Sequence, residues 1–107
     1  MTLIELKNIL DATGYPVAYS HFNSQPVTPY ICYFSTNSSN FIADDKVYSK
    51  FNNVLIELYT EKKDLQAERK LEDILDQYDI PYDTSELFID SEKLYQKIYE
   101  VNLNVGK

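Results

Sequence analysis

The sequence predicts an α+β fold in which two helices pack on one face of a mainly antiparallel sheet. Two segments carry apolar residues at helical spacing, and the other segments are rich in β-branched and aromatic residues. The resulting order of helix, strands, helix and hairpin is typical of helices segregated to one side of an antiparallel sheet. Because 107 residues match the size of one domain, we expect a single domain over residues 1–107.

The first helix is expected over residues 3–13. Thr2 and Glu5 form an S/T-x-x-E capping box, which satisfies free backbone amides at a helix start. Gly14 and Pro16 then stand where helices commonly end. The apolar residues between these signals recur at helical spacing and are expected to form a buried stripe: Leu3, Ile4, Leu6, Ile9 and Leu10.

The second helix is expected over residues 64–78, with Asp64 as its N-cap. Its buried stripe is predicted to consist of Leu71, Ile74, Leu75 and Tyr78. Its charged residues are predicted to face solvent, namely Glu68, Arg69, Glu72, Asp73 and Asp76.

Five segments are expected to be extended, because they are rich in aromatic, aliphatic and β-branched residues. Their ranges are 17–19, 29–36, 47–59, 82–89 and 93–103. The Asn-Ser-Ser-Asn sequence at 37–40 predicts a turn, since these side chains bond their own backbone. Residues 104–107 are expected to form a frayed tail.

The charge balance argues against several classes of ligand. Ten basic and seventeen acidic residues give a formal net charge of −7, which opposes binding to phosphate backbones and to anionic lipid. No apolar run approaches the roughly 18–20 residues of a membrane helix, and no signal peptide is visible. The single cysteine, Cys32, has no internal disulfide partner, which favours folding in a reducing cytosol. We therefore expect no direct sequence-specific nucleic-acid binding and no membrane association.

Patterns that indicate catalysis or metal binding are weak. One histidine and one cysteine cannot build a His/Cys zinc site, and neither a cofactor nor a metal is expected. Asp44 and Asp45, followed by the Glu-Lys-Lys sequence at 61–63, loosely match some magnesium-dependent nucleases, in which carboxylates hold the ion. The alternative is a polar hairpin tip and a strand-to-helix loop. A His21–Cys32 pair is conceivable, but Cys32 lies in an apolar strand pattern, so no catalytic residue is predicted.

Large apolar and acidic residues in loops and turn-flanking segments indicate contacts with other proteins, because aromatic anchors carry much interface energy. The alternative is that these loops fold back and cap the sheet. The hairpin over residues 82–103 also offers an edge strand to another subunit. We place the candidate interface on Phe22, Phe41, Ile42, Asp44, Asp45 and Tyr95.

Several blocks of the sequence resemble minor structural proteins from the head–tail region of long-tailed phages and prophages of Gram-positive bacteria. The blocks occur in the same order and span nearly the whole chain, at residues 10–22, 29–33, 40–48, 56–64, 91–96 and 99–101. Among these proteins the sequence looks most similar to tail terminator, or tail completion, proteins.

This resemblance implies a non-enzymatic protein of the virion that is present in the host cytoplasm during assembly. Its subunits would form a homo-oligomeric ring, commonly hexameric, at the head-proximal end of the tail tube. The ring would stop polymerisation of the tail-tube protein and offer a surface to the head connector. The resemblance assigns no role to an individual residue. A head-completion or connector-adaptor protein of the same neck is the alternative within this class. A small regulatory binding module of the host is an alternative outside it.

Overall fold

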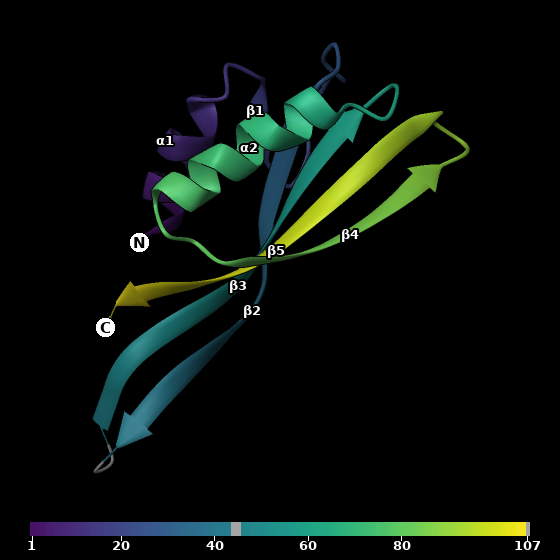
Figure 1. The fold of residues 1–107 in the computed structure, drawn as a ribbon. Helices are drawn as coiled ribbons and strands as arrows, with labels where there is room; N and C mark the ends of the chain where they lie inside the picture. Colours follow the sequence, from purple (N-terminus) through teal and green to yellow (C-terminus); the bar gives the residue numbers. More distant parts are fainter. Residues whose placement is uncertain (44–45, 107) are drawn as a thin grey trace.

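A computed structural model describes the backbone of residues 1–43 and 46–106 and the side chains of residues 1–36 and 51–104. The elements follow one another as α1 (Leu3–Asp11), β1 (Val17–Tyr19), β2 (Tyr30–Ala43), β3 (Lys46–Thr60), α2 (Leu65–Gln77), β4 (Tyr82–Ile89) and β5 (Leu94–Gly106). The described strands form one sheet in the order β1-β2-β3-β5-β4. Neighbouring strands are antiparallel except for β1, which runs parallel to β2. The predicted α+β fold is therefore confirmed (Figure 1).

Both helices begin at the predicted capping residues. The Thr2 side chain accepts a hydrogen bond from the Glu5 amide, and the Glu5 carboxylate accepts one from the Thr2 amide. Asp64 accepts a hydrogen bond from the amide of Ala67 and so caps α2. The first helix ends two residues earlier than expected, and Gly14 follows it with a positive φ of 81°, a conformation that glycine adopts without strain.

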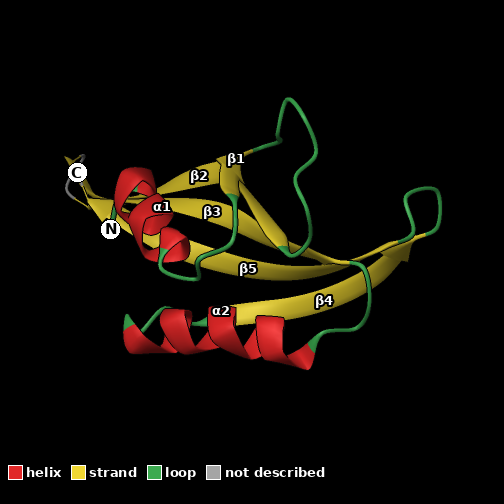
Figure 2. Cartoon of the chain, turned by 90° about the horizontal axis from the view of Figure 1, so that it is seen from above, coloured by secondary structure: helices red, strands yellow, loops and turns green. Residues whose placement is uncertain are grey.

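The helices and the sheet share one apolar core. Both helices pack on the same side of the sheet (Figures 1 and 2). Leu6 and Leu10 of α1 and Leu71 and Leu75 of α2 are fully buried there. The sheet contributes alternate residues of its three central strands, as the period of two predicts; these are Ile31, Tyr33, Val54, Ile56, Leu58, Tyr99, Val101 and Leu103.

The predicted turn at residues 37–40 is wrong. These residues continue β2, which pairs with β3 from Asn37↔Asn53 to Ala43↔Lys46. Register shifts after Ser35 and after Phe41 keep the two strands paired along this length. The continuous partner strand supplies the backbone hydrogen bonds that Asn and Ser side chains would otherwise provide in a turn, so cross-strand pairing overrides the local preference.

The last strand is also longer than predicted. β5 continues to Gly106, which pairs with Lys50, whereas the sequence pattern ended the strand at Leu103 and left a frayed tail. The Met1 ammonium donates a hydrogen bond of 2.6 Å to the Asn104 carbonyl and holds this end of β5 beside the start of α1. Together β2, β3 and β5 extend beyond the helices, and the molecule measures 50 × 28 × 24 Å along its principal axes (Figure 1).

Candidate interaction surfaces

Among the residues whose side chains the structure describes, the side of the sheet opposite the helices is covered near one end. There the loop that joins β1 to β2 folds over the strands (Figure 2). Tyr30, Cys32 and Leu94 are buried beneath it, and Phe22 and Tyr59 pack against them. Farther along this face, register and parity place Phe34, Leu55 and Ile98, all of them half-buried.

Phe22 belongs to this covered end. Its ring meets that of Tyr30 edge to face, with 5.5 Å between the ring centroids. The ring of Tyr30 stacks in turn on that of Tyr59 at 5.0 Å. For Phe22, therefore, the structure favours the alternative that the loop folds back and caps the sheet, and its side chain is partly buried there.

Tyr95 lies at the same end of the sheet as Phe22, but on the helix-facing side of β5. Its ring packs against that of Phe88 on β4 with 4.9 Å between centroids. Phe88 is 45% exposed and its neighbour Leu87 is equally exposed, on opposite sides of β4. Phe88 extends the candidate surface at Tyr95, whereas Leu87 lies on the other face of the sheet. The sequence pattern predicted their strand but did not indicate that these two side chains were exposed.

Phe41 and Ile42 lie in the part of β2 that extends beyond the helices, and their side chains are outside the described residues, as are Asp44 and Asp45. Phe41 is eleven residues beyond Tyr30 along the same strand, a distance of roughly 35 Å. The structure therefore places Phe22 and Tyr95 near one end of the molecule and the backbone of Phe41 and Ile42 near the other, so these four residues do not form one patch.

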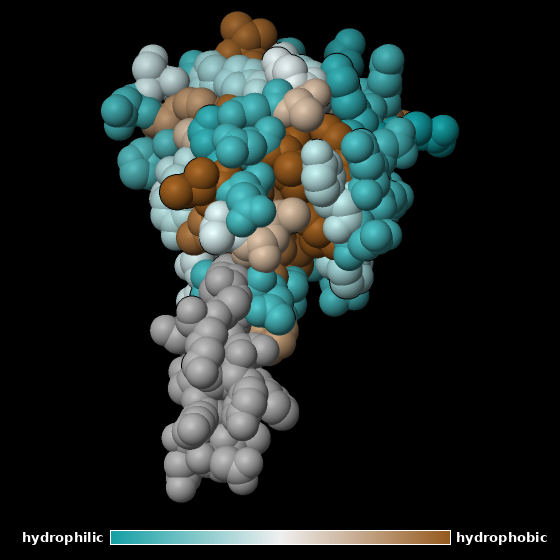
Figure 3. Space-filling view, turned by 90° about the vertical axis from the view of Figure 1, so that its left-hand side faces the viewer, coloured by the Kyte–Doolittle hydropathy of each residue, from teal (hydrophilic) through white to brown (hydrophobic). Residues whose placement is uncertain are grey.

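Exposed apolar side chains also occur on the helices and in the loops. Val27 is 87% exposed, Ile4 76% and Leu65 69%. Ile4 and the half-exposed Tyr78 were predicted to be buried, but helix α1 turns Ile4 outward and Tyr78 is the C-cap, just past the last turn of α2. On the side shown in Figure 3, brown hydrophobic residues are visible between hydrophilic ones. Single exposed apolar residues are common on protein surfaces and mark no site by themselves.

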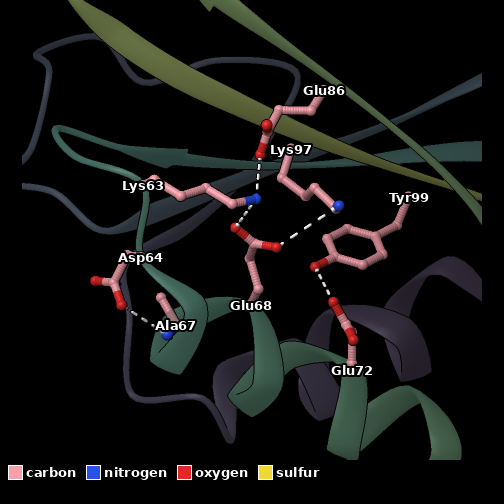
Figure 4. Close-up of polar contacts among 8 residues, drawn as sticks. All are labelled: Lys63, Asp64, Ala67, Glu68, Glu72, Glu86, Lys97 and Tyr99. Carbon is pink, nitrogen blue, oxygen red and sulfur yellow. Dashed lines mark hydrogen bonds and ion pairs between the residues drawn. The ribbon is translucent and has the colours of Figure 1, made fainter.

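A cluster of ion pairs ties α2 to the sheet (Figure 4). Glu68, predicted to face solvent, points inward from α2 and is only 7% exposed. Its carboxylate lies 2.7 Å from the Lys63 Nζ and 3.6 Å from the Lys97 Nζ. Lys63 also pairs with Glu86 of β4, and these pairs raise the pKa of its ammonium group. One lysine thus links the start of α2 to the outermost strand.

One turn further along α2, Glu72 accepts a hydrogen bond of 2.7 Å from the hydroxyl group of Tyr99 (Figure 4). Tyr99 is fully buried in the middle of β5, and burial together with the Glu72 carboxylate raises the pKa of its hydroxyl group. The contact satisfies the one polar atom of this core side chain.

A second polar group is buried on the opposite side of the sheet. The Gln96 side-chain amide donates to Glu57 Oε2 at 2.7 Å and to the Tyr59 hydroxyl oxygen at 2.9 Å. The Tyr59 hydroxyl group donates to Glu57 Oε1 at 3.1 Å. Burial raises the pKa of the Glu57 carboxyl group, and burial with the neighbouring Glu57 charge raises that of Tyr59. The Glu57 carboxyl group therefore accepts hydrogen bonds from two neutral donors, Gln96 and Tyr59.

His21 and Cys32 line the same cleft, which has a volume of about 200 Å³ beneath the β1–β2 loop. The His21 ring nitrogen Nδ1 lies 3.1 Å from the Ser20 hydroxyl oxygen. Burial and the Glu57 carboxylate raise the pKa of the Cys32 thiol to about 11. A nucleophilic cysteine requires the opposite shift, so the surroundings of Cys32 are those of a packed structural thiol.

The acidic and lysine residues of the nuclease-like pattern are only partly described. Asp44 and Asp45 are outside the described residues, and Lys63 is engaged by Glu68 and Glu86. Within residues 1–43 and 46–106, no group of three or more His, Cys, Asp or Glu side chains is placed to hold a metal ion. Over the same residues, neither helix has the length and apolar character to cross a bilayer.

Comparison with known proteins gives a likeness of fold. No family model and no curated protein matches the sequence. Among solved structures, the fold is similar to a chain of a particle described as "Virion of native gene transfer agent (GTA) particle", with a TM-score of 0.65. The alignment covers 95% of this chain and 84% of that chain, at 8% sequence identity. At this identity the likeness shows a shared fold over nearly the whole chain.

Proposed function

We propose that this chain is a structural protein of a phage-like virion. The observation that carries the proposal is the shared fold, over 95% of the chain, with a protein from a gene transfer agent virion. The sequence resemblance to head–tail proteins of long-tailed phages points to the same class. The environment of Cys32, whose thiol pKa is raised to about 11, is consistent with a role that makes and breaks no bond.

Within the virion, we propose that the chain is a tail terminator subunit. Copies form a ring on the head-proximal end of the tail tube, end its polymerisation and bind the head connector. The protein is present in the host cytoplasm during assembly and becomes part of the particle. A twisted sheet with an open edge and an extension beyond the helices suits an assembly held by contacts between different faces of one subunit.

The proposal is tested by reconstituting tail tubes from the tail-tube protein with and without this chain. A terminator should bind tube ends and yield short tubes of uniform length in electron micrographs. Binding to the connector alone, with tube length unchanged, would instead support the connector-adaptor alternative. If the protein binds neither tail tubes nor connectors, a role in the neck would be contradicted.

Phe41→Ala examines the predicted interface within this assay. Loss of a buried interface anchor typically costs about 2 kcal/mol or more. We expect the variant to lose binding to tube ends while its far-ultraviolet circular dichroism is unchanged. Val27→Ala serves as the matched control, because Val27 is 87% exposed in a loop outside the predicted interface and should retain full binding.

A further inference from the structure

Strand β4 is an uncovered edge of the sheet. It pairs with β5 over all eight residues without a register shift, and within the described chain no strand lies on its other side. Six of these eight residues are exposed. Natural edge strands are commonly protected by proline, charged side chains or a bulge. β4 contains no proline, lysine or bulge, and its charged residues are Asp83 and Glu86. Its outward backbone groups are free to pair with another extended chain.

The opposite edge of the sheet is open along part of its length. β1 pairs with only Ile31, Cys32 and Tyr33, and the Tyr19 hydroxyl accepts a hydrogen bond from the Ser35 amide. Beyond this point, residues 37–43 of β2 pair with β3 and with no other strand that the structure describes. The two open edges therefore offer eight residues on one side and seven on the other.

The two edges are compatible in direction, and only one of them carries charged residues. Because β2, β3, β5 and β4 alternate in direction, β4 runs opposite to β2, and two copies in the same orientation would pair these edges antiparallel. β4 carries Asp83 and Glu86 without a lysine or arginine, whereas residues 37–43 carry no charged residue. Pairing β4 with β4 of another copy would oppose two acidic strands, and like charges across strands are destabilising.

We propose that the subunits of the ring join by strand pairing, an inference that rests on the proposed function. In this contact β4 of one copy is added antiparallel to residues 37–43 of β2 in the next copy. The contact uses two different surfaces of each subunit, so it propagates head to tail and closes when the rotation between neighbours permits. The sheets of neighbouring subunits then form one continuous band around the ring.

Hydrogen exchange measured by mass spectrometry tests this contact on the intact chain, alone and assembled on the tail-tube protein. We expect the amides of β4 and of residues 37–43 to become protected together on assembly, while peptides from α2 exchange as before. Protection of β4 alone would overturn the proposal in favour of a β4–β4 contact. A ring that protects neither edge would also overturn it and leave the proposed function intact, whereas the absence of any ring would contradict both.

Proline substitutions provide the second test. Backbone N–H groups along β4 point alternately toward β5 and away from it, so one of the adjacent variants Thr84→Pro and Ser85→Pro removes an outward N–H and keeps the pairing with β5. We expect the variant that retains the parent's circular dichroism to lose ring formation. Ser85→Ala, which changes the side chain but keeps the N–H group, should form rings as the parent does. Normal rings from the folded proline variant would refute the pairing.

Discussion

The buried carboxylate of Glu68 is expected to contribute measurably to stability. Glu68→Gln keeps the size and shape of the side chain but removes its charge. Lys63 would retain Glu86 as its partner, whereas Lys97, whose side chain is only 20% exposed, would lose the ion pair with Glu68. The substitution therefore leaves a mostly buried cation with weakened compensation.

The expected size of the effect follows from burial. Exposed ion pairs contribute about 0.2–1 kcal/mol, and breaking a fully buried pair costs about 3–5 kcal/mol. Here the carboxylate is buried but the Lys63 side chain is 41% exposed, so the pairs fall between these limits. We expect Glu68→Gln to lower the free energy of unfolding by about 2 kcal/mol, equivalent to a Tm lower by roughly 8–12 °C in a domain of this size.

Urea denaturation and thermal melting measure this loss. Asp73→Asn is the matched control, because it removes the same formal charge from an exposed position on the same helix and should change stability by less than about 0.5 kcal/mol. If Glu68→Gln and Asp73→Asn were equally stable, the ion-pair cluster would contribute nothing and the reasoning would be refuted.

Three further outcomes are expected from the buried polar groups. Tyr99→Phe should cost about 1.5 kcal/mol in urea denaturation, because it removes a hydrogen bond to a carboxylate that water can partly replace; an unchanged midpoint would contradict this. Glu57→Gln should be more stable than the parent at pH 7. Since burial raises the folded-state pKa of Glu57, the parent gains stability as the pH falls through that pKa, so the difference between the two proteins should disappear below about pH 4.5, and a difference independent of pH would refute it. Cys32 should react with thiol reagents at pH 8 only after unfolding, because its pKa of about 11 leaves roughly one thiol in a thousand ionised; fast labelling of the folded protein would contradict its burial.

The helices could be predicted from the sequence because their signals are local. Thr2, Glu5 and Asp64 act within one helical turn, and the apolar spacing of α1 and α2 is read within each segment. The alternation of core residues along the central strands is likewise a local pattern. Such features require no knowledge of what lies across the fold.

The remaining features depend on contacts between distant parts of the chain. The sequence pattern of α2 predicts that Glu68 faces solvent, and only the fold shows that Lys97 of β5 lies close enough to pair with it. The turn predicted at residues 37–40 becomes strand only because β3 pairs alongside it. The open edges depend on strand order, which places β4 outermost and leaves β1 covering three residues of β2. Local patterns do not encode these arrangements.

The solution mass of the purified protein, measured alone and with the tail-tube protein, tests the central proposal most directly. A structural ring subunit should shift from its free form into a complex that contains several 12.5 kDa chains bound to the tube protein. A mass that stays at one subunit in both samples, with no tube protein bound, would contradict a role as a ring at the end of the tail.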